Sequence, residues 1–168
     1  LTFDYAATPY TESDPATGMV RELAPPSTSM DKNDESGIAN IGSELNYVLI
    51  PASEGDSDLD SLIMIDTIPV QMELDYTESG GWINLTDDVE VYYQTNLNSN
   101  YQPWTGSPYG VTSDTQLQVS ALTLASGEYV TIVKWIFRNP KRGFTHNGSR
   151  PRVRGPLLEI DRNGNPVM

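Results

Sequence analysis

Cysteine is absent from this sequence of 168 residues, and histidine occurs once, as His146. Without cysteine, neither disulfide bonds nor thiolate metal sites can form. A serine–histidine–aspartate triad would have to use His146, and no nucleophile-elbow or glycine-rich phosphate-binding motif is present. We therefore expect no enzymatic activity and no cofactor, although the many carboxylates leave glycoside hydrolysis open by residue type alone.

Long hydrophobic runs are also missing. No apolar stretch approaches the roughly 18 residues that a membrane-spanning helix needs, so no membrane span is predicted. The chain begins at Leu1 instead of methionine, as expected if a leader was removed or a longer protein was trimmed. The length predicts one domain that buries about 68–70% of its unfolded surface.

Basic residues are scarce over most of the chain. Residues 1–133 carry two basic and 21 acidic side chains, a net charge of −19, whereas residues 134–168 carry eight basic and two acidic side chains, a net charge of +6. An acidic body argues against nucleic acid as a partner. The asymmetry fits either a solvated acidic surface with a basic tail or complementary patches that join copies of the chain. In the second case Arg150, Arg152 and Arg154 are the candidate joining residues.

Extended, alternating segments dominate what is present. Residues 61–67 are largely apolar on both faces, which is typical of a central strand. Pro69 then requires a corner, because proline cannot donate to a β-ladder, and a half-exposed strand is predicted over residues 70–76. Residues 128–138 predict a second central strand. These patterns predict an all-β fold, an immunoglobulin-like antiparallel β-sandwich of about 7–9 strands.

Shorter alternating segments complete the predicted sandwich. Further strands are expected at residues 42–50, 82–85, 89–93, 116–122 and 156–160, with Pro51 ending the first of them and a turn at residues 76–81. We divide the chain into an N-terminal strand with a linker (1–37), a sandwich core (38–138) and a basic C-terminal extension (139–168).

An apolar strand is predicted at the N-terminus. Leu1, Phe3 and Tyr5 alternate with polar residues, and residues 6–37 follow as an irregular linker rich in Pro, Ser, Thr and acidic residues. A strand on such an arm can pair within its own chain or add to the sheet of a neighbouring copy. Both alternatives are open at the level of sequence.

Lys134 lies in the middle of the second predicted central strand, where an unpaired lysine is rarely buried. Its ammonium group can reach solvent at a sheet edge, pair with a carboxylate such as Asp66, or form an intramolecular amide crosslink of the kind found in some surface sandwiches. The sequence leaves these three alternatives open.

Asp56, Asp58 and Asp60 alternate in a connector, a spacing that begins like a calcium-binding loop. The match then fails, because Ser61 and Thr67 stand where such a loop needs glycine and glutamate. We therefore expect a solvated acidic turn and no metal site.

Residues 94–114 form a long polar loop that contains Tyr101, Trp104 and Tyr109. These rings either bind a glycan or hold the loop against the sandwich, and we favour the second role. Asn84 and Asn147 begin Asn-x-Ser/Thr sequons and are candidate glycosylation sites if the protein is exported by an organism that performs this modification.

Three segments resemble a known family. Residues 42–47 (Gly-Ser-Glu-Leu-Asn-Tyr), residues 55–69, which end in Asp-Thr-Ile-Pro, and residues 122–132, which contain the turn Leu-Ala-Ser-Gly, are similar to the surface-protein repeat called domain of unknown function eleven. Ser126 stands where that repeat usually has proline. The resemblance covers roughly residues 38–137. It implies an immunoglobulin-type sandwich in envelope or secreted proteins, with a structural role and no catalytic residues.

These observations predict an extracellular or cell-surface structural protein. The sharpest hypothesis is a filament or pilus subunit that binds copies of itself, with Leu1, Phe3 and Tyr5 added to a neighbouring sheet. One alternative is an adhesin-type module that binds glycans through the loop of residues 94–114. Another is a passive spacer repeat of a larger wall protein.

Overall fold

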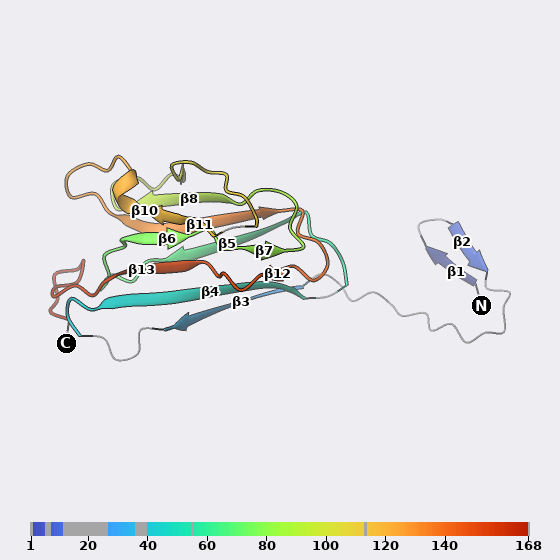
Figure 1. The fold of residues 1–168 in the computed structure, drawn as a ribbon, viewed down its shortest axis with the longest axis horizontal. Coiled ribbons are helices and arrows are strands. Elements are labelled where there is room, and N and C mark those ends of the chain that lie inside the picture. Colours follow the sequence, from blue (N-terminus) through green and yellow to red (C-terminus); the bar gives the residue numbers. More distant parts are fainter. Residues whose placement is uncertain are drawn as a thin grey trace.

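The computed structural model describes residues 27–35, 40–54, 56–112 and 114–167, together with the backbone of residues 2–5 and 8–11. Two antiparallel sheets dominate, one of five strands in the order β10-β6-β13-β4-β3 and one of four strands in the order β5-β11-β8-β9 (Figure 1). Two further sheets have two strands each, β1-β2 and β12-β7. The predicted all-β sandwich is confirmed, while an immunoglobulin-like topology stays a prediction.

The strands have the following bounds: β1 Thr2–Tyr5, β2 Thr8–Thr11, β3 Ser27–Asp34, β4 Glu44–Glu54, β5 Ser61–Thr67, β6 Tyr76–Glu78, β7 Trp82–Ile83, β8 Glu90–Thr95, β9 Gln102–Pro103, β10 Gln116–Gln118, β11 Val130–Arg138, β12 Thr145–His146 and β13 Arg152–Pro156. One short 3₁₀ turn, Val119–Ala121, follows β10. No helix in the part of the chain that the structure describes is long and apolar enough to cross a membrane.

Strand β11 supplies the centre of the core. Val133, Trp135 and Phe137 alternate along it, and their side chains are fully buried. The Trp135 Nε1–H group donates to the carbonyl oxygen of Glu78 on β6 at 3.0 Å and so joins the two sheets. Strict alternation from Val133 would place Val130 on the opposite face, but Val130 is also buried, because a register shift between Val130 and Ile132 changes the alternation.

Strand β5 was predicted to be central, and this prediction is wrong. Within the described chain β5 pairs with β11 alone and forms an edge of the four-stranded sheet. Met64 and Asp66 face the core, whereas Ile63 and Ile65 are 54% and 46% exposed. The sequence shows that both faces are apolar, but it does not show whether a neighbouring element covers the outer face.

Strand β4 was predicted to end at Pro51 but continues to Glu54. Strand β13 pairs with β4 only as far as Val48, whereas β3 pairs with it over its whole second half. Beyond Val48, the side of β4 away from β3 has no continuous ladder, and only separate bonds remain there, from Leu49 N–H to the Pro151 oxygen at 2.9 Å and from Ser53 N–H to the Phe144 oxygen at 3.3 Å. Pro51 lies between these two donors, outside a regular ladder, where a missing N–H group is tolerated.

Strand β3 falls inside residues 6–37, which were predicted to be irregular. It forms an antiparallel hairpin with β4, from Ser27 opposite Glu54 to Asp34 opposite Tyr47. Its described residues are all exposed as a whole, and the strand has no apolar alternation that could reveal it. The prediction of an irregular linker is wrong for β3, and also for β2, which pairs with β1.

Strand β13 lies between β6 and β4, so part of the predicted C-terminal extension is an inner strand of the sandwich. Gly155 is required on it, because a Cβ atom there would lie 1.6 Å from the backbone oxygen of Glu73. The strand predicted at residues 156–160 is instead β13 itself, displaced toward the N-terminus. The half-exposed strand predicted over residues 70–76 is wrong, because only Tyr76 of that segment lies in a strand. Tyr76 is the first residue of β6, which occupies part of the segment that was predicted as a turn.

Candidate functional site

The most distinctive surface of the described chain is the open edge of β5 and the outer face beside it. Register places Ile63 opposite Ile136 and Ile65 opposite Lys134 on β11. The exposed positions of β5 are Ser61, Ile63, Ile65 and Thr67. Edge strands usually carry charged residues that block pairing with other chains. This edge presents two isoleucines and no outward charge.

Lys134 borders this face and is held by aromatic rings. Its Nζ atom lies 3.7 Å from the ring centroid of Tyr101 and 4.8 Å from that of Tyr92. These are cation–π distances. Asp66 lies opposite Val133, on the other face of the sheet, so the alternative in which Lys134 pairs with Asp66 is wrong. The ammonium group instead packs on the outer face.

Asp66 is bound by a lysine that the sequence analysis did not consider, Lys32 of β3. The Lys32 Nζ atom donates to both carboxylate oxygens, at 2.7 and 2.9 Å. The Asp66 side chain is 6% exposed and that of Lys32 is 27% exposed. Burial raises the pKa of Asp66, and Lys32 partly offsets the shift. The pair connects the edge strands of the two sheets, β3 and β5.

Tyr47 packs against this ion pair from β4. Its ring centroid lies 4.7 Å from Lys32 Nζ, so the ammonium group is covered on one side by an aromatic face. Burial raises the pKa of Tyr47, and the nearby carboxylates of Asp34 and Asp66 raise it further. A lysine in a strand of polar residues gives no sequence signal of such a contact, because the contact depends on how the two sheets stack.

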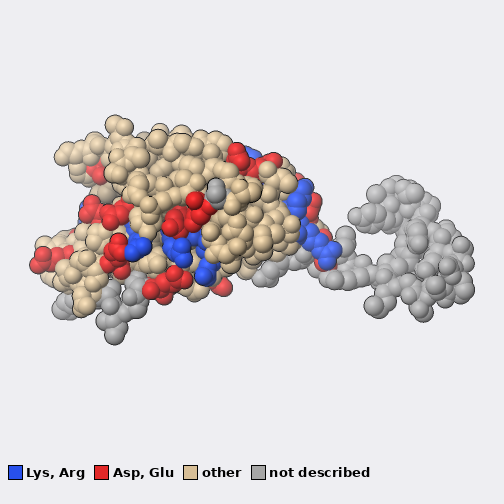
Figure 2. Space-filling model, in the orientation of Figure 1, with Lys and Arg blue, Asp and Glu red and all other residues tan. Residues whose placement is uncertain are grey.

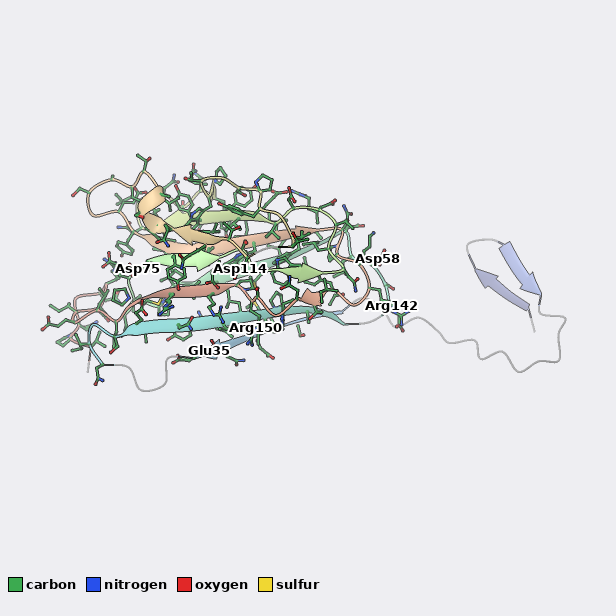
Figure 3. All side chains as sticks on the ribbon, in the orientation of Figure 1. Glu35, Asp58, Asp75, Asp114, Arg142 and Arg150 are labelled. Atoms are coloured by element: carbon green, nitrogen blue, oxygen red, sulfur yellow. The ribbon has the colours of Figure 1, made fainter. Side chains whose placement is uncertain are left out.

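The three arginines predicted to join subunits form ion pairs within the chain. Glu35 lies 3.7 Å from both Arg150 and Arg152, and Arg152 also binds Glu78 at 3.2 Å (Figure 3). Arg154 pairs with Glu44. Figure 2 shows blue basic side chains next to red acidic ones on the face in view. The basic end is therefore largely neutralised by the acidic body of its own chain.

The predicted N-terminal joining strand is present as β1. Phe3 lies opposite Tyr10 and Tyr5 opposite Thr8 in the hairpin with β2, whereas Leu1 lies outside the described residues. Of the two alternatives for this strand, the structure has it paired within its own chain, but in a sheet separate from the sandwich.

The aspartates of the predicted acidic turn bind cationic side chains of the chain itself. Asp56 pairs with Arg142 at 2.9 Å, and Asp58 pairs with Lys141 at 3.2 Å. The backbone N–H of Arg142 and the Lys141 ammonium group hold the pKa of Asp58 below its ordinary value. The backbone oxygen of Asp60 accepts from Asn139. Among the described residues no group of three or more His, Cys, Asp or Glu side chains is placed to hold a metal ion.

The aromatic side chains of residues 94–114 hold the loop against the sandwich. Trp104 is 2% exposed and meets Tyr93 edge to face, with 5.5 Å between ring centroids. Tyr109 is buried and its hydroxyl donates to the backbone oxygen of Thr105 at 2.6 Å, and burial raises its pKa to about 12. With Tyr101 stacked on Lys134, these rings do not form an open platform for a sugar.

Both sequon asparagines already use their side-chain amides. Asn84 is exposed and has a φ of 59°, and its Nδ2 group donates to the backbone oxygens of Arg142 and Gly143, each at 3.0 Å. The Asn147 Oδ1 atom accepts from the backbone N–H of Ser149 at 3.1 Å. A glycan on Asn84 would replace one of the two hydrogen atoms on Nδ2. One of the two hydrogen bonds to the backbone oxygens of Arg142 and Gly143 would then be lost.

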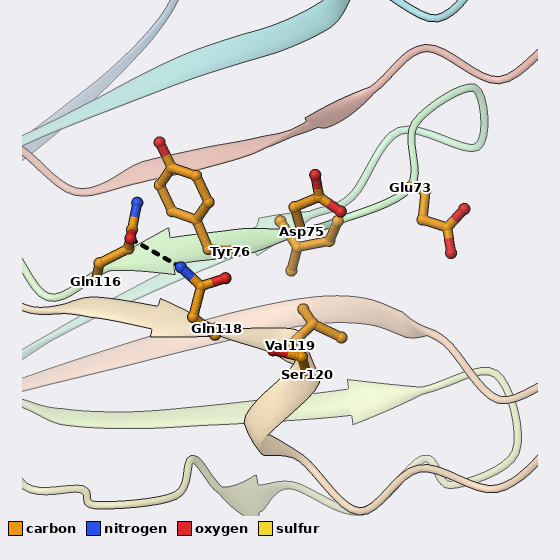
Figure 4. Close-up of a pocket in the computed structure, with 8 residues that line it drawn as sticks. Glu73, Asp75, Tyr76, Gln116, Gln118, Val119 and Ser120 are labelled. Carbon is orange, nitrogen blue, oxygen red and sulfur yellow. Dashed lines mark hydrogen bonds between the residues drawn. The ribbon is translucent and has the colours of Figure 1, made fainter.

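A shallow hollow of about 480 Å³ lies beside β6 and β10 and was not anticipated from the sequence (Figure 4). Its polar lining includes Asp75, Tyr76, Gln116 and Gln118, and the Gln118 Nε2 group donates to Gln116 Oε1 at 2.8 Å. Burial raises the pKa of Asp75, and the negative charges of Glu73 and Glu44 raise it further. Most of the residues that line this hollow are polar, and Leu74 and Val119 are the apolar residues among them.

Comparison with known proteins found no matching family model, no matching curated protein and no matching solved structure. The resemblance to domain of unknown function eleven therefore stays a prediction.

Proposed function

We propose that this protein is a structural subunit of an extracellular filament and that copies join by β-strand addition at the open edge of β5. One observation carries the proposal. Strand β5 is an edge strand with Ile63 and Ile65 exposed and no outward charge. Such an edge has backbone groups ready to pair with another strand and an apolar surface that the added strand would cover.

The incoming strand in this proposal is β1 of a neighbouring copy. Leu1, Phe3 and Tyr5 alternate as an added strand requires. Among the described strands of its own chain, β1 pairs only with β2, and an isolated two-stranded hairpin is marginally stable in water. Exchanging β2 for β5 retains backbone pairing and adds apolar contact. The chain between Tyr5 and Ser27 can extend to about 70 Å at most, which gives β1 room to reach another subunit.

The other long edge of the sandwich supports the choice of β5. Strand β3 presents Asp31, Lys32 and Asp34 along its eight residues, and charges on an edge disfavour pairing with a further strand. Attraction between acidic and basic patches of different copies is not part of the proposal, because Arg150, Arg152 and Arg154 are paired within the chain. The extracellular location rests on the resemblance to surface-protein repeats.

The test compares two single substitutions by size-exclusion chromatography with light scattering and by negative-stain microscopy. Ile65→Lys places a charge on the β5 edge, and Ile83→Lys is the matched control, because both isoleucines are 46% exposed. We expect filaments or large oligomers from the wild type and from Ile83→Lys, and monomers from Ile65→Lys.

Assembly of the Ile65→Lys protein to the wild-type extent would overturn the proposal. So would a wild-type protein that stays monomeric at every concentration, which is the behaviour expected of a passive spacer.

A further inference from the structure

Among the ion pairs found in the described chain, Lys32–Asp66 alone connects strands of the two main sheets. Its side chains, 27% and 6% exposed, are together slightly more buried than those of Arg152–Glu78, which are 29% and 13% exposed. Both Asp66 oxygens lie within 2.9 Å of Lys32 Nζ, and the Asp66 side chain is 6% exposed. The Lys141–Asp58 pair has a longer distance of 3.2 Å, and its side chains are 48% and 55% exposed. Lys32 and Asp66 thus have the contact distance and the partial exclusion of water that a reaction between them requires.

We propose that Lys32 and Asp66 form an intramolecular amide bond that crosslinks β3 to β5. The product is an amide between Nζ of the lysine and Cγ of the aspartate. It would give a cysteine-free chain a covalent connection between its two sheets. The proposal does not depend on filament assembly, because both residues belong to the same chain.

The reaction is a condensation that needs no co-reactant. A proton first passes from the Lys32 ammonium group to the Asp66 carboxylate, which leaves a neutral amine and a neutral carboxylic acid. The amine nitrogen attacks Cγ, the C–N bond forms, and the bond from Cγ to one oxygen breaks. That oxygen leaves as water after taking up a second proton from the nitrogen. Burial favours the neutral pair over the charged one, and it raises the pKa of Asp66 accordingly.

The geometry lowers the barrier that makes amide formation slow in water. Groups held in contact react with effective concentrations of about 10⁵–10⁸ M in favourable cases. The sheet ladders fix both ends of the reacting pair, since Lys32 is paired with Leu49 and Asp66 with Val133. The Tyr47 ring covers one side of the ammonium group and limits the access of water.

The test is the intact mass of the purified, folded protein, followed by peptide mapping. We expect the wild type to be lighter than its sequence mass by one water molecule. A branched peptide should join the segment that contains Lys32 to the segment that contains Asp66. Lys32→Arg retains the positive charge and should have the full sequence mass, and the matched control Lys141→Arg should retain the loss of one water.

Two results would overturn the inference. One is a folded wild-type protein, with a β-sheet circular dichroism spectrum, that has the full sequence mass. The other is a loss of water that persists in Lys32→Arg. Asp66→Ala is a second variant with the expected full mass, and it removes the electrophile instead of the nucleophile.

Discussion

Asp75 carries a negative charge in an unfavourable place, beside the polar hollow and within reach of Glu73 and Glu44. Burial, reinforced by these two carboxylates, raises the pKa of Asp75 in the folded protein. The folded state therefore binds this proton more readily than the unfolded state does. The contribution of Asp75 to stability must fall as the pH rises from the ordinary aspartate pKa through the raised value, and the loss is complete above that window.

Asp75→Asn removes this charge, so the free energy of unfolding at neutral pH should rise, by no more than about 0.5 kcal/mol because the site is exposed. The gain should vanish at a pH below the ordinary aspartate pKa. Urea unfolding of the wild type and of Asp75→Asn, at neutral pH and at a pH below the ordinary aspartate pKa, measures this gain in stability. Asp161→Asn is the control of opposite sign, because backbone N–H groups of Asn165 and neighbouring residues lower the pKa of Asp161. An Asp75→Asn protein that is less stable than the wild type at neutral pH would contradict the argument.

Single residues also mark the limit of what the sequence could reveal about the candidate site. Asp66 was named as the partner in one of three alternatives for a lysine, but that lysine was Lys134. Alternation places Lys134 and Val133 on opposite faces of β11, and Asp66 lies opposite Val133. The correct partner, Lys32, comes from the other sheet. Contacts between sheets depend on how the sheets stack, which the alternation within one strand does not encode.

Among the elements, β3 and β11 differ most in how they are held. Strand β11 buries Val133, Trp135 and Phe137 completely, whereas the described residues of β3 are exposed as a whole and the Lys32 side chain, 27% exposed, is partly buried. Backbone pairing with β4 and a few ion pairs are the main attachments of β3. Strands with little buried apolar surface open with less free energy than core strands do.

Amide hydrogens of β3 should therefore exchange at least about tenfold faster than those of β11, whose exchange should require global unfolding. Hydrogen exchange followed by mass spectrometry measures both strands. The experiment is best made on Lys32→Arg, in which no amide crosslink can hold β3. Equal protection of the two strands in that variant would show that β3 has attachments beyond those described.

The elements that were misjudged share a physical reason. Alternation predicted β11 and the positions of β5 and β8 well, because the core faces of these strands are apolar. It could not assign β5 to an edge, since exposed isoleucines look the same in sequence as buried ones. It missed β3 because a polar strand is defined by its partner β4 and not by its own pattern.

Over the whole molecule, the separation of charge along the sequence becomes a mixture of charges in space. Glu35, Glu44 and Glu78 come from the acidic part of the chain and pair with arginines of the basic end. The sequence predicted the asymmetry, but the antiparallel position of β13 between β6 and β4 brings the two ends of the charge gradient together.

Because β1 and β2 form a sheet of their own, the sandwich should not need them for stability. Deleting residues 1–11 should change the free energy of unfolding by no more than a surface substitution does, about 0.5 kcal/mol. The thermal midpoint of unfolding should therefore stay nearly the same. Under the proposed function, the same deletion should abolish assembly. Thermal unfolding followed by circular dichroism, together with size-exclusion chromatography, measures both. A marked fall in the midpoint would mean that the N-terminal segment packs on the sandwich.

The position of Lys32 within β3 has a mechanical consequence. Tension applied from the N-terminal side reaches the hairpin at Ser27, opposite Glu54, and would peel β3 from β4 one residue pair at a time. Peeling meets Lys32 after the first five pairs, and there the proposed amide bond would transfer the load to Asp66 on β5 and so to the ladder of β11. The intervening residues 33–65 are then shielded from the pull, so a stretched array of such subunits would lengthen little at this point.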